Sequence, residues 1–196
     1  MILNGKINYK ISNNSIKELS RYKRGENALG MILEIMLVLL MISTGLFIHE
    51  LGHAVATVMQ NKKATAEIYL GSSSKEKKLK IILGRITCYL TLALYGFCIQ
   101  PNWREVPLSA VRPRTIFLLG GPLLSLVGAA LFYAAAIFSS GVPESIFVNL
   151  AGICFFLFAS PLLPFTYPRF LGGGRSDGLQ LLNLIKENRK QRNAVL

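Results

Sequence analysis

Residues 31–59 form an apolar run whose only ionisable side chains are Glu34, His49, Glu50 and His53. At about 1.5 Å per residue, a helix of this length is longer than the roughly 30 Å hydrocarbon core of a bilayer. Hydrophobic residues make up 52% of the chain and charged residues only 16%, whereas soluble domains usually carry about 25% charged residues. The run therefore predicts the first span of an integral membrane protein.

Two later segments, residues 115–138 and 145–165, have the same apolar character. In the first of them, Gly121, Ser125 and Ala129 recur every four residues. They give one helix face small side chains, which suits close contact with another helix. The sequence thus predicts an α-helical polytopic membrane protein with a three-span core.

The connection at residues 64–100 contains many β-branched and aromatic residues and predicts a small membrane-associated β element. We expect strands at 66–70 and 79–83, paired as a hairpin across a long polar turn. Stranded backbone is tolerated at membrane depth only inside protein or beside a wet cavity, which favours a re-entrant element. The alternative is a fourth span at 81–100, although Arg85 near its start argues against it.

The segments outside the apolar runs are basic, and the chain carries a net charge of +12. Residues 1–28 are predicted as a basic polar tail and residues 29–190 as a single membrane-embedded domain that ends in an amphipathic helix at 178–190. The basic residues crowd beside the apolar runs, which fits lipid headgroups better than nucleic acid. With three spans, the positive-inside rule places residues 61–114 and the C-terminus in the cytoplasm, and with four spans both termini would lie there.

Both histidines of the chain lie in the sequence HELGH, residues 49–53. Residues four apart share a helix face, so His49 and His53 can present ring nitrogens to one zinc ion. Glu50 lies about 100° around the helix, where it can accept a proton from an attacking water, and Gly52 leaves room beside the metal. This is the zinc-protease pattern. Alternatively, the three polar groups only bond to other helices, but ionisable groups inside a membrane are usually functional.

A catalytic zinc ion needs a third protein ligand, and the sequence offers only carboxylates for it. Glu34 lies about 22 Å away along the same helix, too far to reach. Asp177 returns to the HELGH side after the third span, and its alternative role is to cap the helix that follows. Glu67 and Glu105 are less favoured candidates.

Three segments together resemble the site-2 protease family of intramembrane zinc metalloproteases. They are HELGH at 49–53, GGPLLSLVGAAL at 120–131, and PLLP…SDG from 161 to 178. Their order and separations are similar to those of that family's three-span core, over about residues 31–185. The chain looks like a minimal, core-only member.

The resemblance implies His49, His53 and Asp177 as zinc ligands and Glu50 as the general base. It also implies a membrane-embedded β element between the first two core spans. Two departures stand out: Ser160 lies near the position where the family usually has Asn, and twelve residues separate Pro164 from Asp177.

The predicted function is a Zn²⁺-dependent intramembrane endopeptidase that hydrolyses peptide bonds of membrane-spanning or membrane-associated peptides with metal-activated water. We expect it in the bacterial cytoplasmic membrane, with the active site toward the cytoplasm. Strands 66–70 and 79–83 are expected to bind an unwound substrate as an added strand. The alternative is a non-catalytic membrane protein, either a metal-transport component or an inactive protease-like chaperone. A transporter would show further ligands along its spans, and an inactive relative would have lost Glu50 or a histidine.

Overall fold

The computed structural model describes residues 13–106 and 111–194. The chain divides into two units, Met1–Val38 and Leu39–Leu196. Helix α1 (Asn13–Gln60) runs through this boundary, so residues 13–28, predicted as part of a polar tail, are helical. The first twelve residues of that tail lie outside the described part.

Three helices among the described residues are long and apolar enough to cross a membrane: Ala28–Gln60 within α1, α2 (Val111–Ile137) and α3 (Val142–Leu162). They coincide with the three predicted spans to within a few residues. The fourth span at 81–100 was a wrong alternative, because this segment forms strands. Its Gly84, with a φ of 59°, makes a tight turn that a straight apolar helix would not contain.

The segment between α1 and α2 forms one four-stranded sheet in the order β2-β3-β1-β4. The strands are β1 (Ala66–Leu70), β2 (Leu79–Leu83), β3 (Ile86–Leu90) and β4 (Gly96–Ile99). The two predicted strands have the predicted bounds, but the predicted hairpin between them was wrong. β2 pairs antiparallel with β3 across the Gly84 turn, and β3 then pairs parallel with β1.

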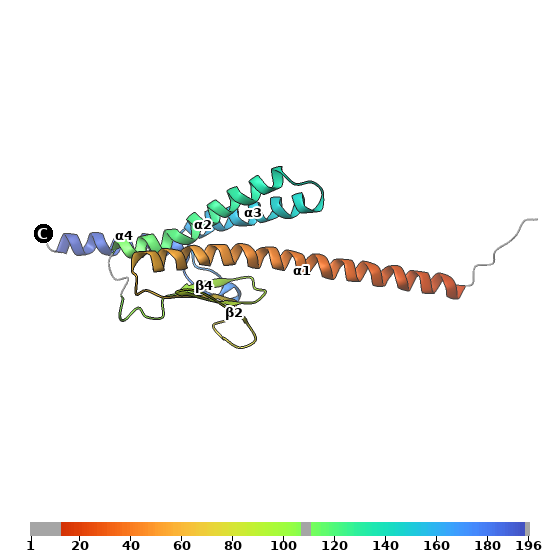
Figure 1. Ribbon diagram of the computed structural model, residues 1–196, viewed down its shortest axis with the longest axis horizontal. Coiled ribbons are helices and arrows are strands. Elements are labelled where there is room, and N and C mark those ends of the chain that lie inside the picture. The colour runs from red at the N-terminus through yellow and green to blue at the C-terminus, as the bar shows by residue number, and fades with distance from the viewer. Residues whose placement is uncertain (1–12, 107–110, 195–196) are drawn as a thin grey trace, which may run out of the picture. The chain divides into compact units, whose positions relative to one another are not determined.

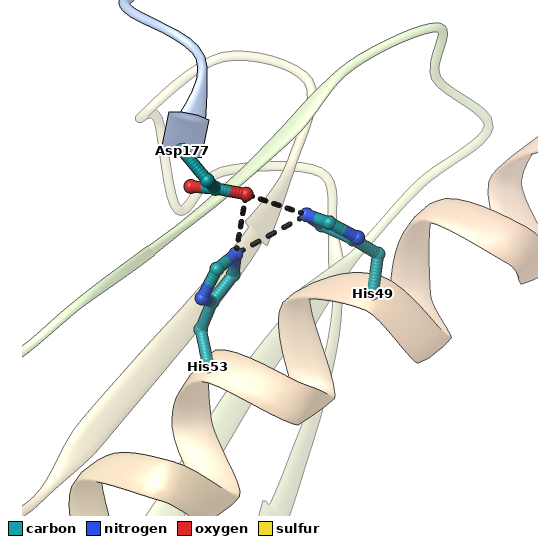
Figure 2. Close-up of side chains that lie close together, drawn as sticks. All are labelled: His49, His53 and Asp177. Atoms are coloured by element: carbon teal, nitrogen blue, oxygen red, sulfur yellow. Dashed lines mark hydrogen bonds and ion pairs between the residues drawn. The ribbon is translucent and has the colours of Figure 1, made fainter. Parts of the chain in front are cut away.

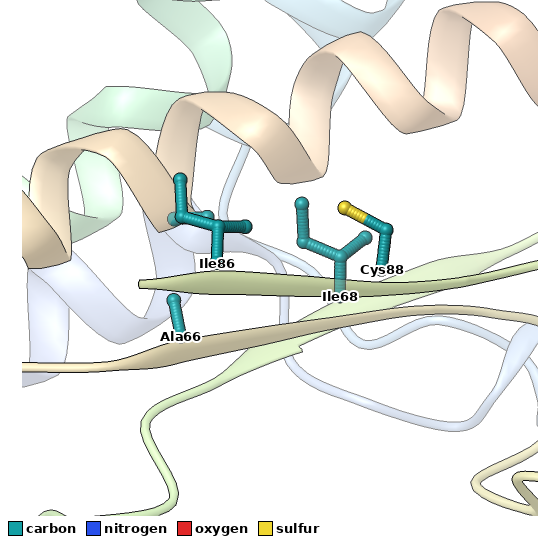
Figure 3. Packing of buried hydrophobic residues seen from close by; sticks show 5 residues of the cluster. Ala66, Ile68, Ile86 and Cys88 are labelled. Carbon is teal, nitrogen blue, oxygen red and sulfur yellow. The ribbon is translucent and has the colours of Figure 1, made fainter. Parts of the chain in front are cut away.

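One face of the sheet packs against residues 39–60 of α1, the part of that helix in the second unit (Figure 1). Alternate residues of a strand point to the same face, and Ala66, Ile68, Ile86 and Cys88 all point toward α1 (Figure 3). They enclose Ala54 of the helix. This core fixes the distance between the sheet and the helix turn that carries HELGH.

On its other side, α1 meets α2 at glycines. A Cβ atom on Gly52 would lie 2.2 Å from the carbonyl oxygen of Gly120, and one on Gly120 would lie 2.5 Å from that of Gly52. Any side chain here would push the backbones apart, so the glycines allow the two helices to touch. The predicted small face of α2 is buried, with Gly121, Ser125 and Ala129 all inside.

A loop joins α3 to α4 (Asp177–Ala194) and contains the short 3₁₀ helix η1 (Arg169–Leu171). The loop folds back on itself, because the backbone N–H of Tyr167 donates to the carbonyl oxygen of Gly174 at 2.8 Å. It returns the chain to the end of α3, where a Cβ atom on Gly178 would overlap the carbonyl oxygen of Leu162. The start of α4 is thereby held beside the helices that carry the site.

Candidate metal centre

His49 and His53 lie one turn apart on α1, and both are buried, with 5% and 4% of their surfaces exposed. Their rings meet edge to face, with centroids 4.8 Å apart. Their Nε2 atoms lie 3.2 Å from each other. The helical spacing of the motif therefore produces two ring nitrogens aimed at one point.

Asp177 completes a triangle of donor atoms with the two histidines (Figure 2). Its Oδ2 atom lies 3.3 Å from Nε2 of His49 and 3.4 Å from Nε2 of His53. Among the described residues, these three side chains form a group that could hold a metal ion. The structure thus brings together the three residues that were expected as ligands.

The size of this triangle suits a small tetrahedral ion. Ligand atoms about 2.0–2.1 Å from zinc at tetrahedral angles are about 3.3 Å from one another. The three observed edges are 3.2, 3.3 and 3.4 Å. Calcium, with ligand distances of about 2.3–2.6 Å and six to eight oxygen ligands, fits this donor set poorly.

The second nitrogen of each imidazole is also bonded. Nδ1 of His53 lies 2.7 Å from the backbone carbonyl oxygen of Phe117. Since a carbonyl only accepts, this Nδ1 carries a hydrogen, and when His53 is neutral and able to bind a metal its Nε2 lone pair faces the triangle. Nδ1 of His49 lies 3.1 Å from the hydroxyl of Ser125, which is fully buried. Both partners belong to α2, so this helix orients both rings as metal-binding histidines require.

The absence of a side chain at Gly121 leaves space for the ring nitrogens. A Cβ atom on Gly121 would lie 2.3 Å from Nε2 of His53 and 2.8 Å from Nε2 of His49. Any other residue would displace the rings or occupy the position of an ion. The room predicted beside Gly52, in contrast, is filled by the backbone of Gly120.

The structure distinguishes the two roles considered for Asp177. Ser176 is the residue that caps α4, because its hydroxyl accepts the backbone N–H of Leu179 at 3.2 Å. The same hydroxyl donates to the carbonyl oxygen of Leu163 at 2.6 Å and accepts the N–H of Phe165 at 3.1 Å. Ser176 therefore fixes the start of α4 and leaves the Asp177 carboxylate free to face the histidines.

The surroundings of Asp177 favour its ionised form. Burial acts to raise its pKa, but the hydrogen bonds with His49 and His53 outweigh burial and lower the pKa to about 2. Metal ligation requires a deprotonated carboxylate. This one is ionised at any physiological pH.

Glu50, 7% exposed, lines the same cavity as the three donors. The cavity has a volume of about 710 Å³, within the roughly 300–1,000 Å³ typical of ligand sites. A Cβ atom on Gly96 of β4 would lie 3.1 Å from Cγ of Glu50. Glu50 thus lies between the donor triangle and the edge of the sheet.

The opposite wall of the cavity comes from the loop between α3 and α4, with Tyr167, Leu171 and Gly172 among its lining residues. A Cβ atom on Gly172 would lie 3.3 Å from the ring of Tyr95, just before β4. Burial raises the pKa of Tyr167 to about 12, with further contributions from Asp177 and Glu50. Its phenol is therefore a neutral hydrogen-bond donor at neutral pH.

Several groups that shape the site were not predicted as site residues. Ser125 could have been noticed as the one hydroxyl in an otherwise apolar small-residue face. The backbone carbonyl of Phe117, the β4 edge and Tyr167 carry no local signal, because their roles depend on which elements meet. Glu67, considered as a ligand, instead pairs with Lys75 at 3.2 Å.

No protein-family model matches the sequence, and neither the curated proteins nor the solved structures contain a match.

Proposed function

We propose that this protein is a zinc-dependent membrane endopeptidase of the site-2 protease type. One observation carries the proposal. The same cavity is lined by three donor residues whose spacing suits a tetrahedral metal ion and by a further carboxyl group, that of Glu50, which is not one of the three donors. A purely structural or transport site needs the donors but not the adjacent base. Three apolar helices support placement in a membrane.

In this proposal His49, His53 and Asp177 hold the zinc ion, which when bound supplies Lewis acidity toward a water molecule and the substrate carbonyl. Glu50 accepts a proton as the water oxygen bonds to the carbonyl carbon, and donates it to the amide nitrogen as the C–N bond breaks. The chain itself thus provides the proton transfer and the positioning.

The substrate is proposed to bind as an added strand, but at β4 rather than at the strands predicted. β1 has neighbours on both sides and cannot accept another strand, and the edge strand β2 contributes no residue to the cavity. Among the strands in the described part of the chain, β4 pairs with β1 alone, and its residues Gly96, Phe97 and Cys98 line the cavity. Peptide bonds hidden in a helix become accessible when the segment extends along such an edge.

The test is zinc content and peptide cleavage by the full chain in membranes. Glu50→Gln should retain zinc and lose cleavage by at least about 100-fold, the usual contribution of a general base. Glu34→Gln is the matched control, since it removes a carboxylate from the same helix outside the cavity. Asp177→Ala should lower zinc occupancy. Equal cleavage by wild type and Glu50→Gln would refute the mechanism.

We propose that the three apolar helices cross a bacterial membrane, and that residues 61–114 and the active site face the cytoplasm. This orientation puts the most basic connections inside. Labelling of single introduced cysteines with a membrane-impermeant reagent would measure it. Labelling of residue 75 from outside intact cells would reverse the assignment.

A further inference from the structure

Three aromatic rings form a row across the sheet, on the face away from α1. Tyr89 of β3, Tyr69 of β1 and Phe97 of β4 are direct cross-strand neighbours. The rings of Tyr89 and Tyr69 are stacked with centroids 4.8 Å apart, and those of Tyr69 and Phe97 with centroids 5.1 Å apart. These distances are close to the spacing of about 4.8 Å between neighbouring strands, so each strand adds one ring to the row.

Lys75 covers the two tyrosines of the row, whereas Phe97 lies at the edge of the sheet. Tyr69 and Tyr89 are buried, and the ammonium of Lys75 lies over them, 5.9 and 5.0 Å from their ring centroids. Lys75 also pairs with Glu67, which holds this cover onto the sheet. Phe97 ends the row at the sheet edge, where one face of its ring meets Tyr69, and it is one of the β4 residues that line the cavity.

The unpaired edge of β4 sets the register of an incoming strand. The N–H of Gly71 donates to the carbonyl oxygen of Tyr95, so Tyr95 and, by alternation, Phe97 direct their backbone groups toward β1. Gly96 and Cys98 direct theirs away from β1, toward the open edge of the sheet. Since Gly96 approaches Glu50, the substrate residue beside Gly96 is nearest the general base, and its neighbour in sequence lies beside Phe97.

We propose that Phe97 forms a subsite for an aromatic side chain of the substrate. This side chain belongs to the residue next in sequence to the substrate residue nearest Glu50, and its ring becomes the fourth ring of the row. This inference rests on the proposed function and names the substrate class: extended peptides with Phe, Tyr or Trp beside the cleaved bond. Ser72 and Ser73 line the cavity as well, and only Gly71 separates them from the end of β1. Stacked rings at this spacing are favourable beyond the area that they bury.

Binding tests the subsite without cleavage. The full-length Glu50→Gln variant, zinc-loaded in detergent micelles, is titrated with a series of labelled apolar peptides. Each peptide has an Ala-rich extended segment with a single Phe, and the position of this Phe differs from one peptide to the next. For the peptide whose Phe lies beside Phe97, Phe97→Ala should reduce the binding affinity about 2- to 12-fold more than it reduces the affinity for the all-Ala peptide. This difference is the usual contribution of a stacked aromatic pair. Phe97→Leu keeps an apolar side chain without a ring and should lose the same preference.

Phe138→Ala is the control, because Phe138 directly follows α2, is 90% exposed and does not line the cavity. Phe138→Ala should change neither the affinity for the Phe-containing peptides nor the affinity for the all-Ala peptide. If Phe97→Leu retains the wild-type preference for Phe over Ala at every position, the subsite is wrong.

Cleavage of a peptide library derived from a protein extract then separates the two proposals. Sites cut by wild type and not by Glu50→Gln should be enriched in aromatic residues beside the cut, and Phe97→Leu should lose this enrichment. Glu50-dependent cleavage without aromatic enrichment would overturn the subsite alone. The absence of any Glu50-dependent cleavage would overturn the proposed function, while the binding measurements still decide on Phe97.

Discussion

Replacement of Ser125 by Ala should weaken metal binding, because the hydroxyl of Ser125 is the partner of His49 Nδ1. The pair is 3.1 Å apart, and Ser125 is fully buried. For Nε2 of neutral His49 to bind a metal, the hydrogen must lie on Nδ1. In the variant this N–H would face an apolar surface with no acceptor, which typically costs about 1–3 kcal/mol.

The metal-free variant avoids most of this cost. Without metal, His49 can carry its hydrogen on Nε2 and donate it to Asp177, whose Oδ2 lies 3.3 Å away. The loss therefore falls mainly on the metal-bound form. We expect zinc affinity to fall about 10- to 100-fold, as is usual for removal of a group that orients a metal ligand.

The assay is competition for zinc between the full chain in detergent and a chromogenic chelator. Ser43→Ala is the matched control, since Ser43 is a buried serine of α1 bonded to the backbone of Ala93 outside the site. It should lower the melting temperature without changing zinc affinity. Ser125→Cys, with a weaker acceptor of similar size, should give an intermediate affinity. Wild-type affinity in Ser125→Ala would refute the argument.

Two further changes test the framework of the site. Gly52→Ala should destabilise the fold by about 3 kcal/mol or more, because the added methyl group would lie 2.2 Å from the carbonyl oxygen of Gly120. Gly152→Ala is the control, since a Cβ atom there has no other atom within 4 Å, and thermal unfolding should show it to be neutral or stabilising. The pKa of Asp177, lowered from 3.8 to about 2, stabilises the metal-free protein above about pH 4 by about 2 kcal/mol, and this contribution is lost as the pH falls to about 2. The stability difference between wild type and Asp177→Asn should accordingly shrink over this range, and a constant difference would contradict the assignment.

The fold was predictable where its signal is local. Hydropathy over some twenty residues identifies a span because the bilayer has a fixed thickness, and the strand bounds at 66–70 and 79–83 follow from composition over a few residues. The pairing of these strands was not predictable in the same way. The Gly84 turn directs β2 to β3, and β3 then occupies the place beside β1. Strand order depends on contacts between segments distant in sequence, which no local pattern contains.

The same division holds for the candidate site. The sequence alone determined that His49 and His53 share one face, since residues four apart do so in any helix, and that Glu50 lies beside them. Only the tertiary structure decided that Ser176 caps α4 and leaves Asp177 to the histidines, and that α2 supplies the partner of each ring. It also decided that β4, and neither predicted strand, borders the cavity. The physical reason is that a helix sets the directions of its own side chains, whereas the third donor, the ring orientations and the open sheet edge arise where separate elements pack together.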